Sequence, residues 1–255
     1  MTTPSADVIS SDVAIDAADG VSRGTLLAPA GNGRHPGVLF LTDISGIRPA
    51  VLDRAARLAA HGYTVVVPNV FYRTGEPPFF SFPIDFANPV SRDRFNAMTS
   101  ALTPEAIAHD AVAYVRFCHS QHAVQPGPLA IVGHCFTGAV ALRMAGAEGA
   151  AVRFVASFHG GGLHTDKPNS PHFVLPKVSA RLYFAHATDD RSMSAESIQQ
   201  FEQELRTWGG EFESETYRAH HGWTMADHPA YHAALAERAF EALTSRLAEL
   251  FPKAS

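Results

Sequence analysis

Short apolar runs alternate with segments of helical periodicity along most of this chain, and this alternation strongly constrains its fold. Residues 37–41 and 64–67 are continuous apolar runs, and leucine and alanine recur at helical spacing between them, over 50–61. Parallel strands need long connections, which are usually helices, so the sequence predicts a mostly parallel central sheet with helices on both faces. The series continues with helices expected at 104–120, 136–147, 195–208 and 229–251, and strands at 129–132, 154–158, 181–185 and 213–217.

The N-terminal residues depart from this pattern. Residues 1–12 are polar and rich in serine, threonine and alanine, and we expect them to form a loose N-terminal segment. Residues 13–15 and 22–27 flank the turn-prone pair Asp19-Gly20, which predicts an antiparallel hairpin at the edge of the sheet. The chain length and the unbroken series of elements predict that residues 13–255 form a single domain.

Composition restricts the class of function. The 255 residues carry a formal net charge of −5, and the 20 lysines and arginines are thinly spread. Binding to nucleic acid or to a membrane surface needs a clustered basic face, so we expect a small-molecule partner and a monomer or small homo-oligomer. Residues 1–12 lack the pattern of an export signal, and no apolar run is as long as a membrane span, which predicts a cytoplasmic protein.

The cysteines and histidines do not form a recognisable metal motif. Cys118 and Cys135 are the two cysteines, and they lie in segments of different character, so a structural disulfide is not expected. The 14 histidines are scattered and show neither Cys-x-x-Cys nor His-Glu-x-x-His spacing. We therefore expect neither a metal nor another cofactor.

Cys135 lies between a predicted strand and a predicted helix, within residues 133–138 (GHCFTG). The α/β-hydrolase fold places a sharp turn with the nucleophile at such a junction, and Gly133 supplies a small residue before it. The start of a helix also favours a thiolate. The alternative is an inert buried thiol, a description that fits Cys118 better because it lies within a helix. We therefore expect Cys135 to be the nucleophile.

A thiol nucleophile needs a base and an acid, and α/β-hydrolases supply them in the chain order nucleophile, acid, histidine. Asp189 and Asp190 follow one predicted strand, and His220 and His221 follow the next. Each role therefore has two adjacent candidates. The alternative is that the aspartates cap a helix and the histidines are merely solvated.

These loops resemble those of the dienelactone hydrolase family (carboxymethylenebutenolidase-like), which has the α/β-hydrolase fold. Residues 186–193 (HATDDRSM) and 219–227 (AHHGWTMAD) carry the resemblance, which covers the chain from about residue 13 onward. It implies a triad of Cys135, Asp190 and His221. It also implies hydrolysis of an ester or lactone, such as an enol lactone, through an acyl-thioenzyme.

Two further segments resemble the family. Residues 42–46 (TDISG) place Asp43 where the family has a carboxylate that holds the resting thiol. Residues 67–73 (VPNVFYR) place Arg73 where the family has an arginine that binds the substrate carboxylate. A second substrate-binding arginine of the family is replaced here by Met225.

The fold also predicts the groups that would stabilise an oxyanion. Acyl transfer in this fold uses the backbone N–H of the residue after the nucleophile and an N–H from the loop after the first central strand. In this chain these donors are Phe136 and Ile44.

Two other functions stay open. A general carboxylesterase of the same fold agrees with Met225 in place of arginine. A thiol sensor or ligand-binding protein needs a reactive Cys135, but it does not need an acid and a histidine on two separate loops. The irregular segments 73–94 and 160–177 are expected either to wall or cover a pocket or merely to connect elements.

Overall fold

A computed structural model describes residues 7–81 and 84–251. Its strands form one sheet in the order β1-β2-β4-β3-β5-β6-β7-β8. The first two strands form an antiparallel hairpin, β2 pairs antiparallel with β4, and all later neighbours are parallel. This confirms the predicted sheet and hairpin. The strands are β1 (Val8–Ala17), β2 (Gly20–Pro29), β3 (Gly37–Phe40), β4 (Thr64–Pro68), β5 (Leu129–His134), β6 (Val152–Phe158), β7 (Arg181–Asp189) and β8 (Phe212–His220).

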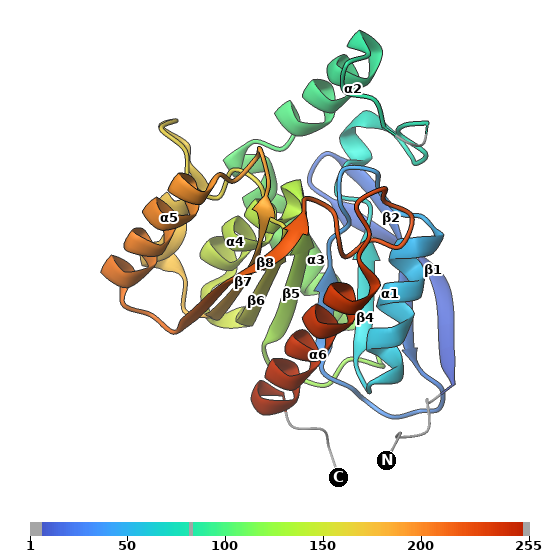
Figure 1. Cartoon of the computed structure of the whole chain (residues 1–255). Coiled ribbons are helices and arrows are strands. Elements are labelled where there is room, and N and C mark those ends of the chain that lie inside the picture. The colour runs from blue at the N-terminus through green and yellow to red at the C-terminus, as the bar shows by residue number, and fades with distance from the viewer. Residues whose placement is uncertain (1–6, 82–83, 252–255) are drawn as a thin grey trace.

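Helices cover both faces of the sheet (Figure 1). On one face α1 and α6 lie together, joined by an ion pair between Arg57 and Glu237, while α3, α4 and α5 pack on the other face. The helix α2 projects beyond the sheet. The helices are α1 (Pro49–Ala60), α2 (Pro89–Ser100), α3 (Pro104–Ser120), α4 (Phe136–Glu148), α5 (Ala195–Trp208) and α6 (Ala233–Leu250), with short 3-10 turns η1 (Tyr72–Thr74), η2 (Gly149–Ala151) and η3 (Pro171–Lys177).

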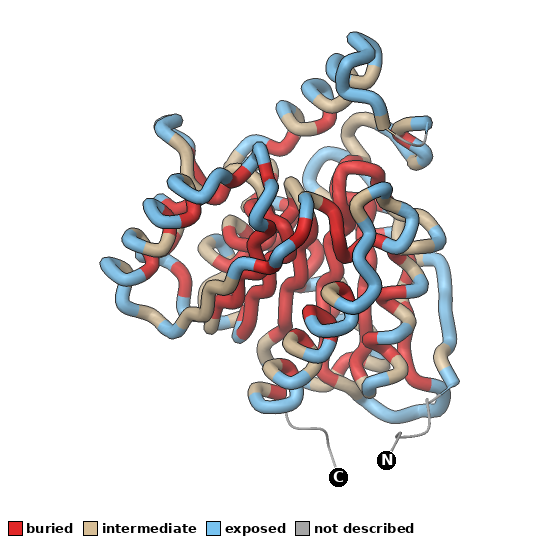
Figure 2. The backbone as a smooth tube through the Cα atoms, in the orientation of Figure 1, coloured by how far each residue is buried: buried red, intermediate tan, exposed pale blue. Residues whose placement is uncertain are grey.

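The central strands are buried on both sides, and most of their positions are apolar (Figure 2). Side chains alternate between the two faces, as the pleat of a strand requires. In β3, Val38 and Phe40 pack against α1 and α6, whereas Leu39 packs on the opposite side. The continuous apolar runs in the sequence therefore belong to strands covered by helices on both faces.

The hairpin extends further than the sequence predicted. β1 begins at Val8, which pairs with Pro29, so the expectation that residues 8–12 are loose was wrong. Backbone pairing with β2 holds these polar residues in an edge strand, where their side chains are mostly exposed. β2 pairs on both sides and is not an edge strand. Residues 1–6 of the expected loose segment lie outside the described residues.

The segment expected to be irregular at residues 73–94 contains the start of α2. The side chain of Asn88 caps this helix by accepting a hydrogen bond from Val90 N at 2.9 Å, and Pro89 occupies the first turn. This Asn-Pro pair was the missed helix signal. Within residues 7–81 and 84–251, no helix is long and apolar enough to cross a membrane.

Candidate active site

Cys135 occupies the turn between β5 and α4 in a strained backbone conformation, with φ of 56° and ψ of −130°. Positive φ is uncommon for a residue with a side chain and persists only where the surroundings enforce it. The Cys135 N–H donates to Phe158 O at 3.0 Å and to His159 Nδ1 at 3.1 Å. The Cys135 carbonyl accepts from Gly138 N at 3.0 Å. These bonds hold the turn from both sides.

Close packing around this turn explains two of its glycines. A Cβ at position 133 would lie 2.3 Å from Thr137 O, and a Cβ at position 138 would lie 2.2 Å from Ser157 Oγ. Thr137 is buried beneath the turn, where its hydroxyl accepts from His134 N and donates to His134 O, both at 2.9 Å. The sharp turn therefore depends on these neighbours as well as on Cys135.

Asp190 and His221 come together in the loops after β7 and β8. The ring nitrogen Nδ1 of His221 donates to Asp190 Oδ2 at 2.6 Å. The other carboxylate oxygen of Asp190 accepts from the backbone N–H of Ser192 at 2.8 Å and from the Ser192 hydroxyl at 2.6 Å. Burial would raise the pKa of Asp190, but the hydrogen bonds from His221 and Ser192 outweigh burial and lower the pKa. Asp190 is therefore ionised at neutral pH.

His221 also interacts with Cys135 through a side-chain hydrogen bond, and Ser192 Oγ lies 3.4 Å from the Nδ1 of His221. Burial alone would lower the pKa of His221. The interactions with Cys135 and Asp190 outweigh burial and raise the pKa of His221 to about 11. Because Nδ1 is bonded to Asp190, Nε2 is the nitrogen left for the sulfur. The structure thus brings Cys135, His221 and Asp190 into one chain of contacts.

The neighbouring pair Asp189 and His220 also meets, but in a different environment. His220 Nδ1 lies 2.7 Å from Asp189 Oδ2, and the two side chains are 71% and 68% exposed. The side chains of His221 and Asp190 are 28% and 2% exposed. Of the two adjacent candidates for each role, the inner pair is the one that reaches Cys135.

The predicted oxyanion donors come from two separate segments of the chain. Phe136 is the first residue of α4, and the first N–H groups of a helix have no partner within the helix. Ile44 lies in the loop after β3 and is buried. The loop that carries Ile44 is fixed by backbone bonds, since Leu41 N donates to Val132 O at 2.7 Å and Gly46 N donates to Asp43 O at 3.1 Å.

Asp43 is bound by Arg48. The Arg48 guanidinium donates to Asp43 Oδ1 at 2.7 Å and to Asp43 Oδ2 at 2.8 Å, and it also donates to the two oxygens of Asp227 at 2.6 and 3.0 Å. In the described part of the chain no hydrogen bond joins Asp43 to Cys135. The expected contact with the thiol is thus replaced by an ion pair that links the Ile44 loop to the loop of His221.

Arg73 has internal carboxylate partners. Its Nη1 and Nη2 donate to Asp110 at 2.6 and 3.0 Å, and its Nε donates to Asp19 Oδ2 at 2.7 Å. Asp110 is buried and Arg73 is only 12% exposed. The family resemblance implies that Arg73 binds the substrate carboxylate. To bind there, that carboxylate would have to displace Asp110 or Asp19.

His159 is a site residue that the sequence reasoning missed. It directly follows β6, has φ of 41° and is buried. Burial, together with the charges of His221 and His134, lowers the pKa of His159 well below its ordinary value. The neutral ring accepts the Cys135 N–H at Nδ1 and contacts Thr224 Oγ1 through Nε2 at 2.8 Å. The available signal was a polar residue directly after an apolar strand.

Comparison with known proteins identifies the family. The model of the dienelactone hydrolase family matches residues 23–251. A carboxymethylenebutenolidase from Pseudomonas sp. (strain P51) is 29% identical over 195 residues, which cover 75% of this chain and 76% of that protein. A provisionally assigned carboxymethylenebutenolidase from Synechocystis sp. is 24% identical over 222 residues, covering 86% of this chain and 87% of that protein.

A solved structure agrees with the fold. The crystal structure of a provisionally assigned dienelactone hydrolase from Klebsiella pneumoniae superimposes with a TM-score of 0.84 at 19% identity, covering 95% of this chain and 99% of that chain. This likeness supports the fold, and the family match extends it to a class of activity, hydrolysis of the ester and lactone kind. The chain therefore belongs to the dienelactone hydrolase family.

Proposed function

We propose that this protein hydrolyses an ester or lactone with Cys135 as the nucleophile, His221 as the proton donor and acceptor, and Asp190 as the group that orients His221. The observation that carries the proposal is the position of His221 between a buried carboxylate and the Cys135 side chain. A thiolate beside an imidazolium is nucleophilic without a further base. The strained turn presents this sulfur at the end of β5.

In the acylation step the Cys135 sulfur forms a bond to the carbonyl carbon, and one electron pair of the C=O bond moves to the oxygen. The N–H groups of Phe136 and Ile44 stabilise this oxyanion. When the intermediate collapses, the bond to the leaving oxygen breaks, and that oxygen takes the Nε2 proton of His221. The product of this step is an acyl-thioenzyme with a neutral His221.

In the deacylation step His221 takes a proton from a water molecule whose oxygen attacks the thioester carbonyl. Collapse of the second intermediate expels the Cys135 thiolate and releases the carboxylic acid. The proton stays on His221, so the thiolate and imidazolium pair is restored. In the acylation intermediate the Cys135 thiolate leaves more easily than an ordinary alkoxide, which would return the substrate. This cycle therefore suits activated esters and enol lactones, whose oxygen is a better leaving group.

Uncharged esters and lactones are favoured over substrates that carry a free carboxylate beside the ester bond. Arg73 already binds Asp110 and Asp19, and Arg48 already binds Asp43 and Asp227. Met225, which replaces the family's second substrate-binding arginine, is buried. These observations favour the general carboxylesterase among the candidate functions.

A substrate panel tests this proposal. Steady-state turnover is measured on p-nitrophenyl acetate, a neutral enol lactone and a carboxylate-bearing dienelactone, for the natural protein and the Cys135→Ala variant. We expect turnover of the neutral substrates, a lower kcat/KM for the charged lactone, and no turnover by the variant. A single burst of nitrophenol without turnover would indicate a thiol sensor instead.

A further inference from the structure

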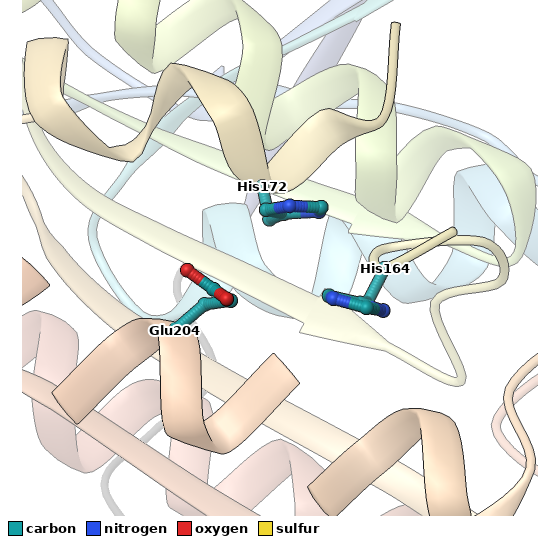
Figure 3. A group of neighbouring side chains, drawn as sticks. All are labelled: His164, His172 and Glu204. Carbon is teal, nitrogen blue, oxygen red and sulfur yellow. The ribbon is translucent and has the colours of Figure 1, made fainter. Parts of the chain in front are cut away.

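The loop between β6 and η3 approaches α5 with two histidines and a glutamate (Figure 3). His164 lies in this loop, His172 lies in η3, and Glu204 projects from α5. Their side chains point toward a common space, and one ligand atom from each lies within 4.8 Å of the other two. The histidines are eight positions apart in the sequence and the glutamate is distant, which is why no motif spacing indicated the cluster.

Zinc chemistry matches this donor set. Zn²⁺ accepts imidazole nitrogen and carboxylate oxygen, and two histidines with one glutamate are a known set of three protein ligands. Three atoms at most 4.8 Å apart can share an ion about 2.8 Å or less from each, whereas bonds to zinc are about 2.0–2.2 Å long. An inward movement of under about 1 Å by the ligand atoms, with one of the two stacked rings turned so that its nitrogen lone pair points at the ion, would complete the site.

The orientation of His172 leaves a nitrogen free for such a bond. Its Nδ1 lies 2.7 Å from the hydroxyl of Ser170, which is buried and also accepts from Thr165 N at 2.9 Å. A partner on one ring nitrogen is the usual arrangement of a zinc-bound histidine, because it fixes the ring and its tautomer.

An ordinary ion pair does not account for the cluster. Among the described residues, neither imidazole forms an ion pair with Glu204, and neither the Glu204 carboxylate nor the His164 ring nitrogens make a hydrogen bond to protein. The two rings stack with centroids 4.3 Å apart, an arrangement that is unfavourable if both rings are cationic. Three half-buried or buried groups thus converge, and each has a ligand atom that can bind a metal ion.

We propose that His164, His172 and Glu204 bind one Zn²⁺ ion, with a water molecule as the fourth ligand. The ion joins the loop at residues 160–170 to α5. The loop borders the catalytic groups, since Gly161 N donates to Cys135 O at 3.3 Å and Gly162 N donates to Ser192 O at 2.9 Å. The site is separate from the hydrolytic chemistry, and its role is to clamp the loop to the helix.

Zinc titration of the EDTA-treated protein tests this site. The full chain carries Cys135→Ala, because the natural thiol and His221 would also bind zinc, and binding is followed by calorimetry and by the melting temperature. We expect one Zn²⁺ per chain and a melting temperature that rises with zinc concentration. His164→Gln and Glu204→Gln each remove one ligand, and each is expected to weaken binding at least tenfold and to abolish the rise.

His109→Gln and Glu196→Gln are the matched controls, since both residues are exposed and Glu196 lies on the same helix as Glu204. They should bind zinc as the parent does. Equal affinity in all five proteins, or no binding by the parent, would overturn the site. Circular dichroism confirms that each variant is folded, and Glu204→Gln keeps the shape of the side chain. Failure here would leave the esterase activity of the natural protein unaffected, so the two proposals are tested separately.

Discussion

The Nδ1 nitrogen of His221 and the Oδ2 oxygen of Asp190 lie 2.6 Å apart, and the His220 and Asp189 side chains beside them make a contact of nearly the same length, 2.7 Å. The inner pair is largely buried and adjoins Cys135, whereas the outer pair is exposed. Exposed ion pairs contribute little free energy because water and salt screen them. The chain therefore contains its own control for the importance of the inner pair.

Asp190→Asn should lower kcat by about 10²- to 10⁴-fold, because an amide does not hold the imidazolium in its orientation or stabilise its charge. Asp189→Asn, one residue away, should change kcat less than twofold. Both values come from steady-state hydrolysis of p-nitrophenyl acetate, with circular dichroism to verify folding. A similar loss in both variants would show that the loop, and not the Asp190 carboxylate, is what matters.

Much of the fold could be predicted because the central strands are buried on both faces. Such strands are continuously apolar, so the runs at β3, β4 and β5 stand out in the sequence, and the helices between them show their period. The edge strand β1 was underestimated because its side chains are mostly exposed and polar. The start of β1 is determined by its backbone pairing with β2, and such pairing leaves no apolar pattern in the sequence.

Arg48 is expected to position the loop that carries Ile44. Arg48→Ala leaves the carboxylates of Asp43 and Asp227 without their shared cation, and Asp43 is buried. We expect a loss of about 3 kcal/mol in the free energy of unfolding, measured by urea denaturation. We also expect kcat to fall about tenfold with little change in KM, because the Ile44 N–H acts on the oxyanion.

Arg57→Gln is the matched control for Arg48, since Arg57 is in the same helix region and its ion pair with Glu237 is about half exposed. This variant should lose under about 1 kcal/mol and keep its kcat. Arg48→Lys keeps the charge but not the planar guanidinium that binds both carboxylates, so it should restore only part of the activity. Full activity in Arg48→Ala would exclude a positioning role.

Buried neutral histidines should make the protein sensitive to acid. Burial lowers the pKa of His186 to about 4, and neither ring nitrogen has a partner among the described residues. The pKa of His186 in the folded protein lies below the ordinary value of 6.5. Above pH 6.5 the histidine is neutral in both the folded and the unfolded chain, so it has no effect on the unfolding free energy. Between pH 6.5 and 4 the unfolded chain binds a proton that the native state does not, which lowers the unfolding free energy by up to about 1.4 kcal/mol per pH unit.

His186→Phe removes this titration and keeps the ring that stacks on Phe184. In urea denaturation at pH 7, 6 and 5, the variant should gain stability relative to the natural protein as the pH falls. His122→Gln changes an exposed histidine and should leave the pH dependence as it is. If the unfolding free energy falls equally with pH in His186→Phe and in the natural protein, His186 is not the source of the acid sensitivity.

The residues proposed to be catalytic stand out in the sequence because they follow strands in a fixed chain order, but the contacts around them leave no such pattern. His159 accepts the Cys135 N–H from a position 24 residues further along the chain, and Arg48 binds Asp227, which is 179 residues away. The role expected for Arg73 rested on its place after β4, and its aspartate partners come from the hairpin and α3. Long-range partners of this kind are set by packing and leave no local pattern.

The central claim is that Cys135 carries the acyl group. Rapid acid quenching during turnover of p-nitrophenyl acetate, followed by mass spectrometry of the peptide that contains Cys135, measures this directly. We expect a mass increase of one acetyl group on Cys135, at a greater level in His221→Gln, whose thioester is slow to hydrolyse, and no such adduct in Cys135→Ala. Turnover without an acyl adduct on Cys135, or undiminished turnover by Cys135→Ala, would contradict the proposed mechanism.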